Sequence, residues 1–368
     1  MSKFPSKIRI SRFWLCYFFI RLFYLFFAIF VYAQLTQLGD NRRYIRANVP
    51  FSLRIFHDST HMVDFFAGNV SNLFREDMLL SNLPATLISF FIIRWAIEKL
   101  ELRRYVNNIL LMITISFPNF SVWTAVWSKE LFGLVYTAII AVLIINFLKG
   151  NFKIKIIDFI GLYLCFLFNP QFIPFILQGL IFIFIARYTM LHKPANQLRL
   201  SIIFLLMNII ILYLIRDIVN RYAGGMHAHF DTPFAGTTRD NIFLEDYDFF
   251  RHLPWGMFIA FFGPTFAEMT ENPLLAITGL ESLLKIMVFI YLSKYVIINI
   301  LLKFHFPTLL PISYFMIIMG ISFMHYPFGV FNPGSAIRYR SRFVFLFTVL
   351  LLYLYSQRAR VLTICRKK

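Results

Sequence analysis

Two carboxylates lie where an apolar run of the sequence is expected to meet solvent. Asp40 follows Gly39 at the start of a polar loop, and Glu130 follows Lys129 at the head of an apolar run. A carboxylate in such a place can act as a general base or hold a hydroxyl group of a substrate. Both also have structural interpretations, because Asp40 can cap the next helix and Glu130 can pair with Lys129. The two interpretations stay open for each residue.

Basic residues that could hold an anion accompany these carboxylates. Arg338, Arg340 and Arg342 alternate along the chain just before an apolar run of about 14 residues, 343–356. The planar guanidinium group fits phosphate and carboxylate oxygens, and a helix N-terminus favours an anion. We therefore expect the three arginines to form a phosphate clamp. The alternative is that these residues anchor the chain at a membrane interface.

A His-x-His-x-Asp pattern ends at Asp231, in a polar stretch of the chain. Neutral imidazoles and a carboxylate can ligate a metal ion. However, two histidines two residues apart point the same way only on a strand, and no further set of ligands is evident. We therefore expect no metal ion and no cofactor, and we retain His229 as a candidate that moves protons.

Two further candidates lie within or beside apolar runs. Glu281 and Lys285 are four residues apart, on one face of a helix. Ionisable groups inside a membrane are costly and often functional, although this pair could simply lock two helices together. Trp127 belongs either to an aromatic belt at the membrane interface or to a substrate site.

Composition defines the class of protein that must position these residues. The chain has 368 residues, of which 59% are hydrophobic and only 15% are charged, and its mean hydropathy is +0.68. Soluble domains average about 45–50% apolar and about 25% charged residues. The composition excludes a cytosolic globular enzyme and a disordered protein. The three cysteines provide neither a disulfide framework nor the spacing of a metal site.

Apolar runs long enough to cross a bilayer recur along the whole chain. We expect an all-α, polytopic bundle of about ten transmembrane helices, forming a single integral membrane domain over residues 1–368. The expected crossings are 13–36, 79–97, 107–127, 131–148, 156–169, 171–186, 200–215, 273–293, 306–325 and 343–356. The apolar stretch 254–267 is interrupted by Gly263-Pro264, and we expect it to be re-entrant or interfacial.

The net charge of +18 follows from the orientation of these crossings. If both termini are cytoplasmic, the inner loops and tails hold twenty basic and two acidic residues, as the positive-inside rule requires. The outer side then holds thirteen basic residues, twelve of them arginine, and twelve acidic residues. The outer loops would be 37–78, 216–253 and 326–342. The excess charge therefore reports topology and does not indicate nucleic acid.

Four short stretches of the chain carry a resemblance to a known family. They are Gly39-Asp40 with Tyr44, Pro118…Trp123…Lys129-Glu130, Pro254-Trp255…Pro264…Glu281, and Arg338-Tyr339-Arg340. With these stretches the chain resembles the Wzy-type polymerases of O-antigen and other oligosaccharide repeat units. Its outer loops are smaller than the two large loops of many such polymerases.

The resemblance implies a multi-pass glycosyltransferase of the bacterial inner membrane. It would move a growing glycan from undecaprenyl pyrophosphate onto a new lipid-linked repeat unit at the periplasmic face, releasing the lipid pyrophosphate. Its partners would be that lipid-linked oligosaccharide, the lipid bilayer and a chain-length regulator. The base would be Asp40, Glu130 or His229. The residues expected to bind pyrophosphate or glycan are Arg43, Lys129, Arg338, Arg340, Arg342, Trp127 and Glu281.

Two other functions fit the same sequence. One is a membrane glycosyltransferase that takes a single sugar from a polyprenyl-phosphate donor. The other is a flippase or transporter of lipid-linked oligosaccharides.

Overall fold

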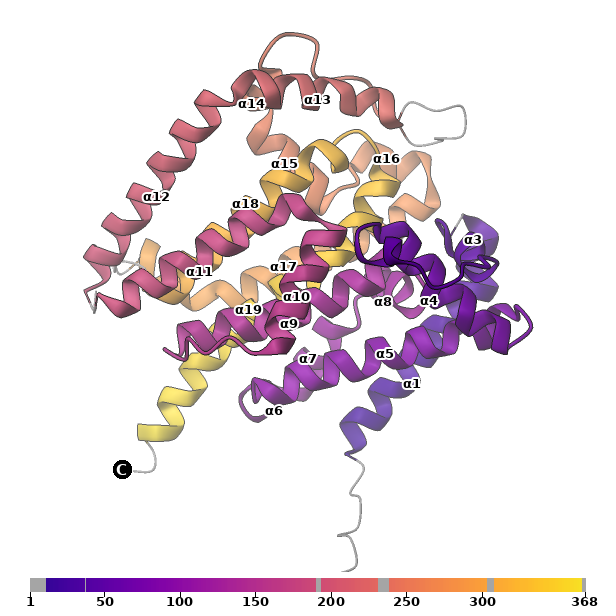
Figure 1. Ribbon diagram of the computed structural model, residues 1–368. Helices are drawn as coiled ribbons and strands as arrows, with labels where there is room; N and C mark the ends of the chain where they lie inside the picture. Colours follow the sequence, from indigo (N-terminus) through magenta and orange to yellow (C-terminus); the bar gives the residue numbers. More distant parts are fainter. Residues whose placement is uncertain (1–10, 37, 190–192, 231–237, 303–307, 366–368) are drawn as a thin grey trace, which may run out of the picture.

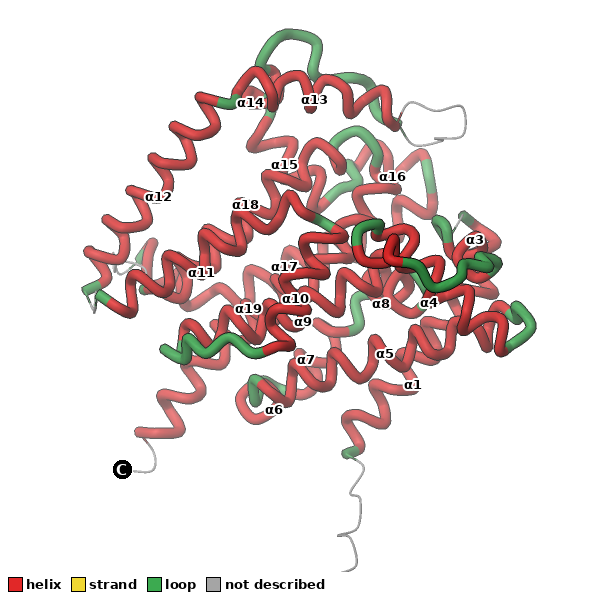
Figure 2. The backbone as a smooth tube through the Cα atoms, viewed as in Figure 1, coloured by secondary structure: helices red, strands yellow, loops and turns green. Residues whose placement is uncertain are grey.

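The computed structural model describes residues 11–36, 38–189, 193–230, 238–302 and 308–365. Throughout these residues the chain is helix or loop, without a β-strand (Figure 2). The expected all-α fold is therefore confirmed. Short 3-10 helices (Leu53–Phe56, Pro170–Phe172) and one π-helical turn (Ala28–Tyr32) accompany the α-helices.

Nineteen α-helices are assigned in the described residues. In chain order they are α1 (Arg12–Phe27), α2 (Ala33–Leu35), α3 (Asn41–Ile45), α4 (Ser59–Leu73), α5 (Met78–Lys99), α6 (Leu102–Tyr105), α7 (Asn108–Ile115), α8 (Pro118–Ala125), α9 (Lys129–Leu148), α10 (Ile156–Phe168), α11 (Ile173–Tyr188), α12 (Pro194–Leu214), α13 (Arg216–Phe230), α14 (Asp248–Arg251), α15 (Leu253–Phe262), α16 (Phe266–Glu271), α17 (Pro273–Leu301), α18 (Leu309–Gly329) and α19 (Pro333–Cys365).

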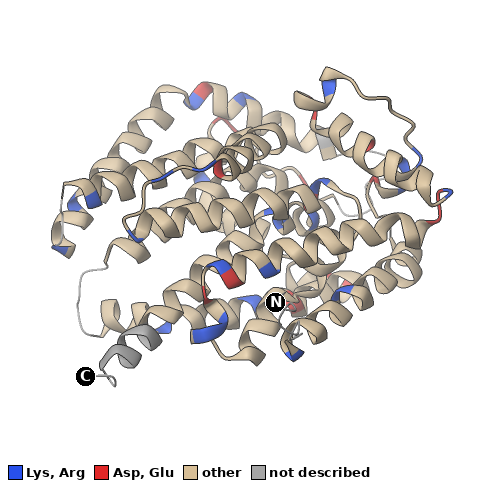
Figure 3. Cartoon of the chain, turned by 60° about the horizontal axis from the view of Figure 1, so that its bottom comes forward, with Lys and Arg blue, Asp and Glu red and all other residues tan. Residues whose placement is uncertain are grey.

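The chain is a polytopic helical membrane protein. Seven helices in the described residues are long and apolar enough to cross a bilayer. They are Arg12–Leu35, Met78–Lys99, Lys129–Leu148, Pro170–Tyr188, Pro194–Leu214, Pro273–Leu301 and Leu309–Gly329. Along these segments, long stretches of ribbon carry no charged residue (Figure 3).

The other three expected crossings are helical but differ from simple spans. The segment 107–127 is the pair α7 and α8, bent by 58°, and it brings the number of spans to eight if the pair crosses as one. The segment 156–169 is α10, which has only 13 residues. The segment 343–356 lies within the 33 residues of α19. A count of ten crossings stays a prediction.

The bend between α7 and α8 has a cause in the sequence. Pro118 is the first residue of α8, and the residue before a proline is disfavoured in the α-helical region. Phe117 is accordingly non-helical, with φ −51° and ψ 127°. Hydropathy detects the apolar run but not the break, which is why the sequence predicts one straight crossing here.

The break expected in 254–267 is present at the same residues. The helix α15 ends at Phe262, and α16 begins at Phe266 after Gly263-Pro264. With ten residues, α15 is about 15 Å long, about half of what a crossing needs. Thr265 caps α16 and forms a capping box with Glu268.

The helix α9 forms the centre of the bundle. In its apolar window 83% of the residues are buried, against 11% in α12. It packs against α19, α10 and α5. Gly133 allows α19 to approach, because a Cβ at this position would lie 2.7 Å from the Cβ of Arg342. In Figure 1, α12 leans away from α11 and α18 at the edge of the bundle.

The packing of α15 on α18 gives the first testable prediction. A Cβ at Gly256 would lie 1.8 Å from the ring of Tyr326, which is fully buried. We expect Gly256→Ala to lower the free energy of unfolding by about 1–3 kcal/mol, as overpacking does. Thermal unfolding in detergent, followed by tryptophan fluorescence, measures this. The control is Gly225→Ala in α13, where a Cβ would meet nothing within 4 Å; equal effects of the two changes would contradict the prediction.

Candidate functional site

Three segments far apart in the sequence bring charged side chains together. They are the loop after the first span, with α3, and the N-terminal ends of α9 and α19. We call the residues that meet there the charge cluster: Asp40, Arg43, Lys129, Glu130, Arg338 and Arg342. Six of the ten residues that the sequence nominated therefore lie in one place.

Glu130 joins α9 to α19. Its Oε1 accepts from Nε of Arg338 at 3.1 Å and from Nη2 and Nε of Arg342 at 3.0 and 3.3 Å. The side chain of Glu130 is 0% exposed, so substrate has no access to it. Its Oε2 is buried and has no hydrogen-bond partner among the described residues. Burial lowers the pKa of Arg338, but Glu130, Tyr339, Asp40 and Tyr44 together outweigh burial, so the pKa is raised.

Asp40 is the accessible carboxylate of the charge cluster. Its side chain is 48% exposed, and its Oδ2 lies 3.3 Å from Nη2 of Arg338. The Nε of Arg43 lies 3.8 Å from the other oxygen, Oδ1. Tyr44 donates to Oδ2 at 3.4 Å; burial and then the charge of Asp40 raise the pKa of Tyr44, so the phenol keeps its proton. Asp40 precedes α3 but accepts no capping hydrogen bond from it.

Gly39 allows Arg338 to reach Asp40. Its φ is +53°, a conformation that favours glycine. A Cβ at this position would also lie 2.6 Å from Nη1 of Arg338. The Gly39-Asp40 pair of the sequence is therefore a spatial requirement of the charge cluster.

Lys129 is the least committed cation of the charge cluster. It is half-buried, and within the described parts of the chain no carboxylate oxygen lies within 4 Å of its Nζ. The nearby charges that act on it include Arg342, Asp40 and Glu130. Arg43, by contrast, also pairs with Asp64, with Nη1 and Oδ2 3.2 Å apart. When Asp64 is included, four cations face three carboxylates, so the site carries one excess positive charge.

Aromatic rings form one wall of the charge cluster. The guanidinium of Arg338 lies 5.4 Å from the ring centroid of Trp123, and that of Arg342 lies 4.7 Å from the ring of Tyr339. Such cation–π contacts hold guanidinium groups in place while leaving their donors available.

Arg340 points away from the other two arginines of its run. On a helix, residues 338 and 342 are one turn apart and share a face, whereas residue 340 lies on the opposite side. The side chain of Arg340 is fully buried and donates to the carbonyls of Phe261 and Gly263 at 2.6 and 2.9 Å, and to the hydroxyl of Ser282 at 3.0 Å. The expected clamp of three arginines is therefore a clamp of two, with Arg340 holding the end of α15.

Glu281 lies in the bundle interior and not in the charge cluster. It is ion-paired with Lys285, and its Oε2 accepts from the backbone N–H and the side-chain amide of Asn119 at 2.7 and 2.5 Å. The backbone N–H belongs to the first turn of α8, so Glu281 caps this broken helix from another helix.

Trp127 also has a structural role, as a link between helices. It is buried, and its indole N–H donates to the carbonyl of Ser81 at 2.7 Å, which ties the α8–α9 turn to α5. The tryptophan beside Arg338 is Trp123. His229 lies in α13, but its side chain and Asp231 fall outside the described residues. Among the residues that are described, no group of three His, Cys, Asp or Glu side chains could hold a metal ion.

Two residues of this region were not nominated from the sequence. Asp64 is in α4, and one of its oxygens is buried without a hydrogen-bond partner in the described residues. Asn119 contacts Glu281 from α8. Asp64 was recognisable only as one of twelve outer acids, and nothing in the sequence reports that α4 folds back onto α3.

Comparisons with known proteins leave the family open. The chain matches no protein-family model, and no match is found among the curated proteins or the solved structures. The geometry of the site is therefore the basis for the function proposed below.

Because Glu130 is buried and Asp40 is half-exposed, we expect the two carboxylates to contribute differently to the stability of the protein. We expect Glu130→Gln to lower the free energy of unfolding by about 3–5 kcal/mol, because it removes the buried carboxylate that Arg338 and Arg342 share and leaves Arg342 without a carboxylate partner among the described residues. Asp40→Asn removes a half-exposed partner and should cost about 0–1 kcal/mol. Thermal unfolding of both proteins in the same detergent tests this. A Glu130→Gln protein as stable as Asp40→Asn would show that Glu130 does not hold α9 and α19 together.

Proposed function

We propose that the protein is a glycosyltransferase that takes its glycan from a polyprenyl-linked phosphate donor. In the more specific form, it polymerises oligosaccharide repeat units from undecaprenyl pyrophosphate. The observation that carries the proposal is the charge cluster: an accessible carboxylate beside cations that exceed the carboxylates in number, at one end of a membrane-spanning bundle.

Asp40 is the proposed general base. It would accept the proton of an acceptor hydroxyl while that oxygen attacks the anomeric carbon of the donor glycan. The bond from the anomeric carbon to the phosphate oxygen breaks, and its electron pair leaves with the phosphate. Exposure decides between the two candidate carboxylates, because Asp40 is 48% exposed and Glu130 is 0% exposed.

The cations are proposed to stabilise the leaving group. Negative charge grows on the departing phosphate or pyrophosphate in the transition state, and preorganised donors at that point lower the barrier. Lys129 and the free donors of Arg338 supply the positive charge. Glu130 acts as a positioning residue, since it fixes both arginines of α19 from one side.

The proposal includes an orientation. Ten crossings with both termini in the cytoplasm would place the charge cluster at the periplasmic face of a bacterial inner membrane. The supporting observation is the distribution of charge in the sequence, in which basic residues dominate one set of loops.

Loss of the proposed base is the first functional prediction. We expect Asp40→Asn to abolish the long-chain ladder of surface glycan in a deletion strain complemented with the variant, with membrane insertion unchanged. General-base catalysis typically contributes about 10²–10⁴-fold in rate. Asp246→Asn, at an exposed carboxylate hydrogen-bonded to Asn220, is the control and should retain the ladder.

The pattern that remains identifies the reaction. A surface glycan capped with one repeat unit indicates a repeat-unit polymerase, whereas loss of one sugar from every unit indicates a single-sugar transferase. A normal ladder in Asp40→Asn would contradict the proposed function.

Lys129 gives a second, binding-level prediction. Because this lysine has no carboxylate partner at close range, Lys129→Met should leave folding unchanged. We expect about tenfold weaker binding of farnesyl pyrophosphate, a short analogue of the leaving group, since a hydrogen bond to a charged group contributes about 1.5–3 kcal/mol. Titration of the detergent-purified protein measures this, with Lys153→Met, at an exposed residue elsewhere, as the control. Unchanged affinity in Lys129→Met would remove this residue from the anion site.

A further inference from the structure

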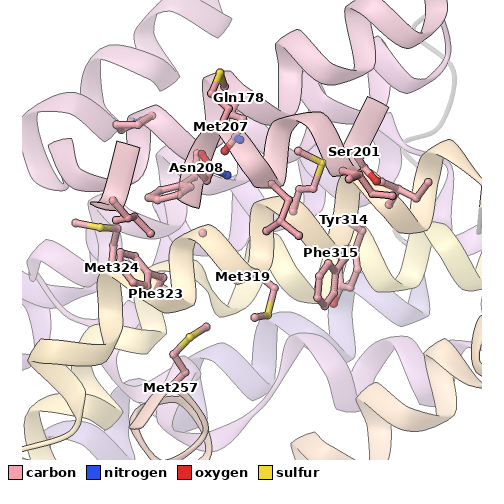
Figure 4. A pocket seen from close by; sticks show the side chains of 18 of the residues that line it. Gln178, Ser201, Met207, Asn208, Met257, Tyr314, Phe315, Met319, Phe323 and Met324 are labelled. Atoms are coloured by element: carbon pink, nitrogen blue, oxygen red, sulfur yellow. The ribbon is translucent and has the colours of Figure 1, made fainter. Parts of the chain in front are cut away.

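A large cavity lies between α11, α12, α17 and α18, apart from the charge cluster. Its volume is about 980 Å³, and none of the described residues that line it is charged. Its apolar lining includes several flexible methionines, such as Met257, Met319 and Met324, which adapt to ligands of irregular shape (Figure 4).

The lining of the cavity extends along most of α12. Along α12 its lining extends from Leu198 to Ile215, which corresponds to about 26 Å of helix. The hydrocarbon core of a bilayer is about 30 Å thick, and the acyl chains of one phospholipid cover only half of it. A ligand that fills the cavity along α12 would therefore span more than the depth of one leaflet.

The two ends of the cavity differ in chemistry. Because α9, α10, α11 and α12 run alternately up and down, the start of α11 and the end of α12 lie at the same level as the charge cluster. Gln178 and Asn208 line the cavity near this end, about 8–9 Å from the helix termini.

Gln178 offers a donor that the protein leaves unused. Its Nε2 is buried and has no hydrogen-bond partner within the described residues. An unpaired amide donor in an apolar cavity favours a ligand that brings an acceptor oxygen to this level. The cavity therefore suits a chain that is polar at the end near the charge cluster and apolar along the rest of its length.

The helix α15 connects this end of the cavity to the charge cluster. Met257 lines the cavity, and Phe261, one turn later, offers its carbonyl to Arg340 of α19. Arg338 and Arg342 flank Arg340 on the same helix. One turn of α15 therefore separates the cavity wall from the helix that carries the proposed anion site.

We propose that this cavity binds the polyprenyl chain of the lipid-linked substrate, with its phosphate-bearing end at the level of Gln178 and Asn208. This inference rests on the proposed glycosyltransferase function. It adds the location of the carrier lipid in the protein. It also assigns to α12 the recognition of chain length, and to Gln178 of α11 the recognition of the phosphate oxygen nearest the chain.

A pair of neighbouring isoleucines on α12 provides the test. Ile211 lines the cavity, whereas Ile210 is 59% exposed and does not line it. We expect Ile211→Trp to bind undecaprenyl phosphate about tenfold more weakly than the wild-type protein, because the indole occupies the cavity. Ile210→Trp, with the same change of size on the other face, should bind normally. The measurement is a titration of each purified protein in detergent with undecaprenyl phosphate.

Gln178→Leu keeps the shape of the cavity and removes the donor. It should weaken binding of undecaprenyl phosphate severalfold and leave binding of the alcohol, undecaprenol, nearly unchanged. Equal affinities of Ile211→Trp and Ile210→Trp would overturn the inference. So would a phospholipid that copurifies in the cavity, detected by mass spectrometry, and is not displaced by undecaprenyl phosphate.

These readouts are independent of glycosyl transfer. If undecaprenyl phosphate binds as expected but Asp40→Asn retains a normal glycan ladder, the proposed reaction fails and the lipid site stands. If Asp40→Asn loses the ladder and Ile211→Trp retains both the ladder and lipid binding, the reaction stands and the lipid site fails.

Discussion

Inside a membrane, the backbone groups at a helix break and the charge of every ionisable side chain must be satisfied by the protein itself. This constraint organises the structure. Among the described residues, the helix breaks at Phe117-Pro118 and between α15 and α16 at Gly263-Pro264 are each contacted by a buried charged residue from another helix. Glu281 accepts from the free N–H of Asn119 at the start of α8, and Arg340 donates to the free carbonyls of Phe261 and Gly263 at the end of α15. Each of these buried charges thus has hydrogen-bond partners at a helix break, and each break has its backbone groups paired by a buried charge.

This pairing separates buried ionisable residues that maintain the fold from those that can meet a substrate. Arg21 belongs to the first group: it is fully buried in α1 and donates to Ser89, Thr124 and the carbonyl of Ser121. Asp40 belongs to the second group, because half of its side chain reaches solvent. A buried ionisable residue in a membrane protein thus shows that hydrogen bonds or ion pairs offset its desolvation. To act on a substrate, the residue must in addition be accessible.

The sequence predicts the class of the fold well, because apolar runs and loop charges report membrane helices directly. It predicts the meeting of Asp40 with Glu130 and Arg338 for a related reason: charged residues at the same ends of successive spans converge. It cannot predict which way a side chain points within such a set. The alternation of Arg338, Arg340 and Arg342 in the sequence suggests one clamp. On a helix, however, Arg338 and Arg342 share one face and Arg340 lies on the opposite face. Hydropathy likewise does not reveal the 58° bend between α7 and α8 or the lean of α12 away from the bundle.

The arrangement of Glu130 has a consequence for how the charge cluster can respond to an anion. Arg338 and Arg342 share one oxygen of Glu130, and Arg338 also donates through Nη2 to Asp40, which leaves part of each guanidinium available to an anion. Had each arginine met its own carboxylate through two parallel hydrogen bonds, little positive charge would remain to attract a phosphate. Glu130 and Asp40 balance Arg338 and Arg342, and Asp64 balances Arg43, so the one excess positive charge of the site corresponds to Lys129. A phosphate entering the site would thus complete a charge balance that the protein alone leaves incomplete, while Asp40 remains accessible beside it.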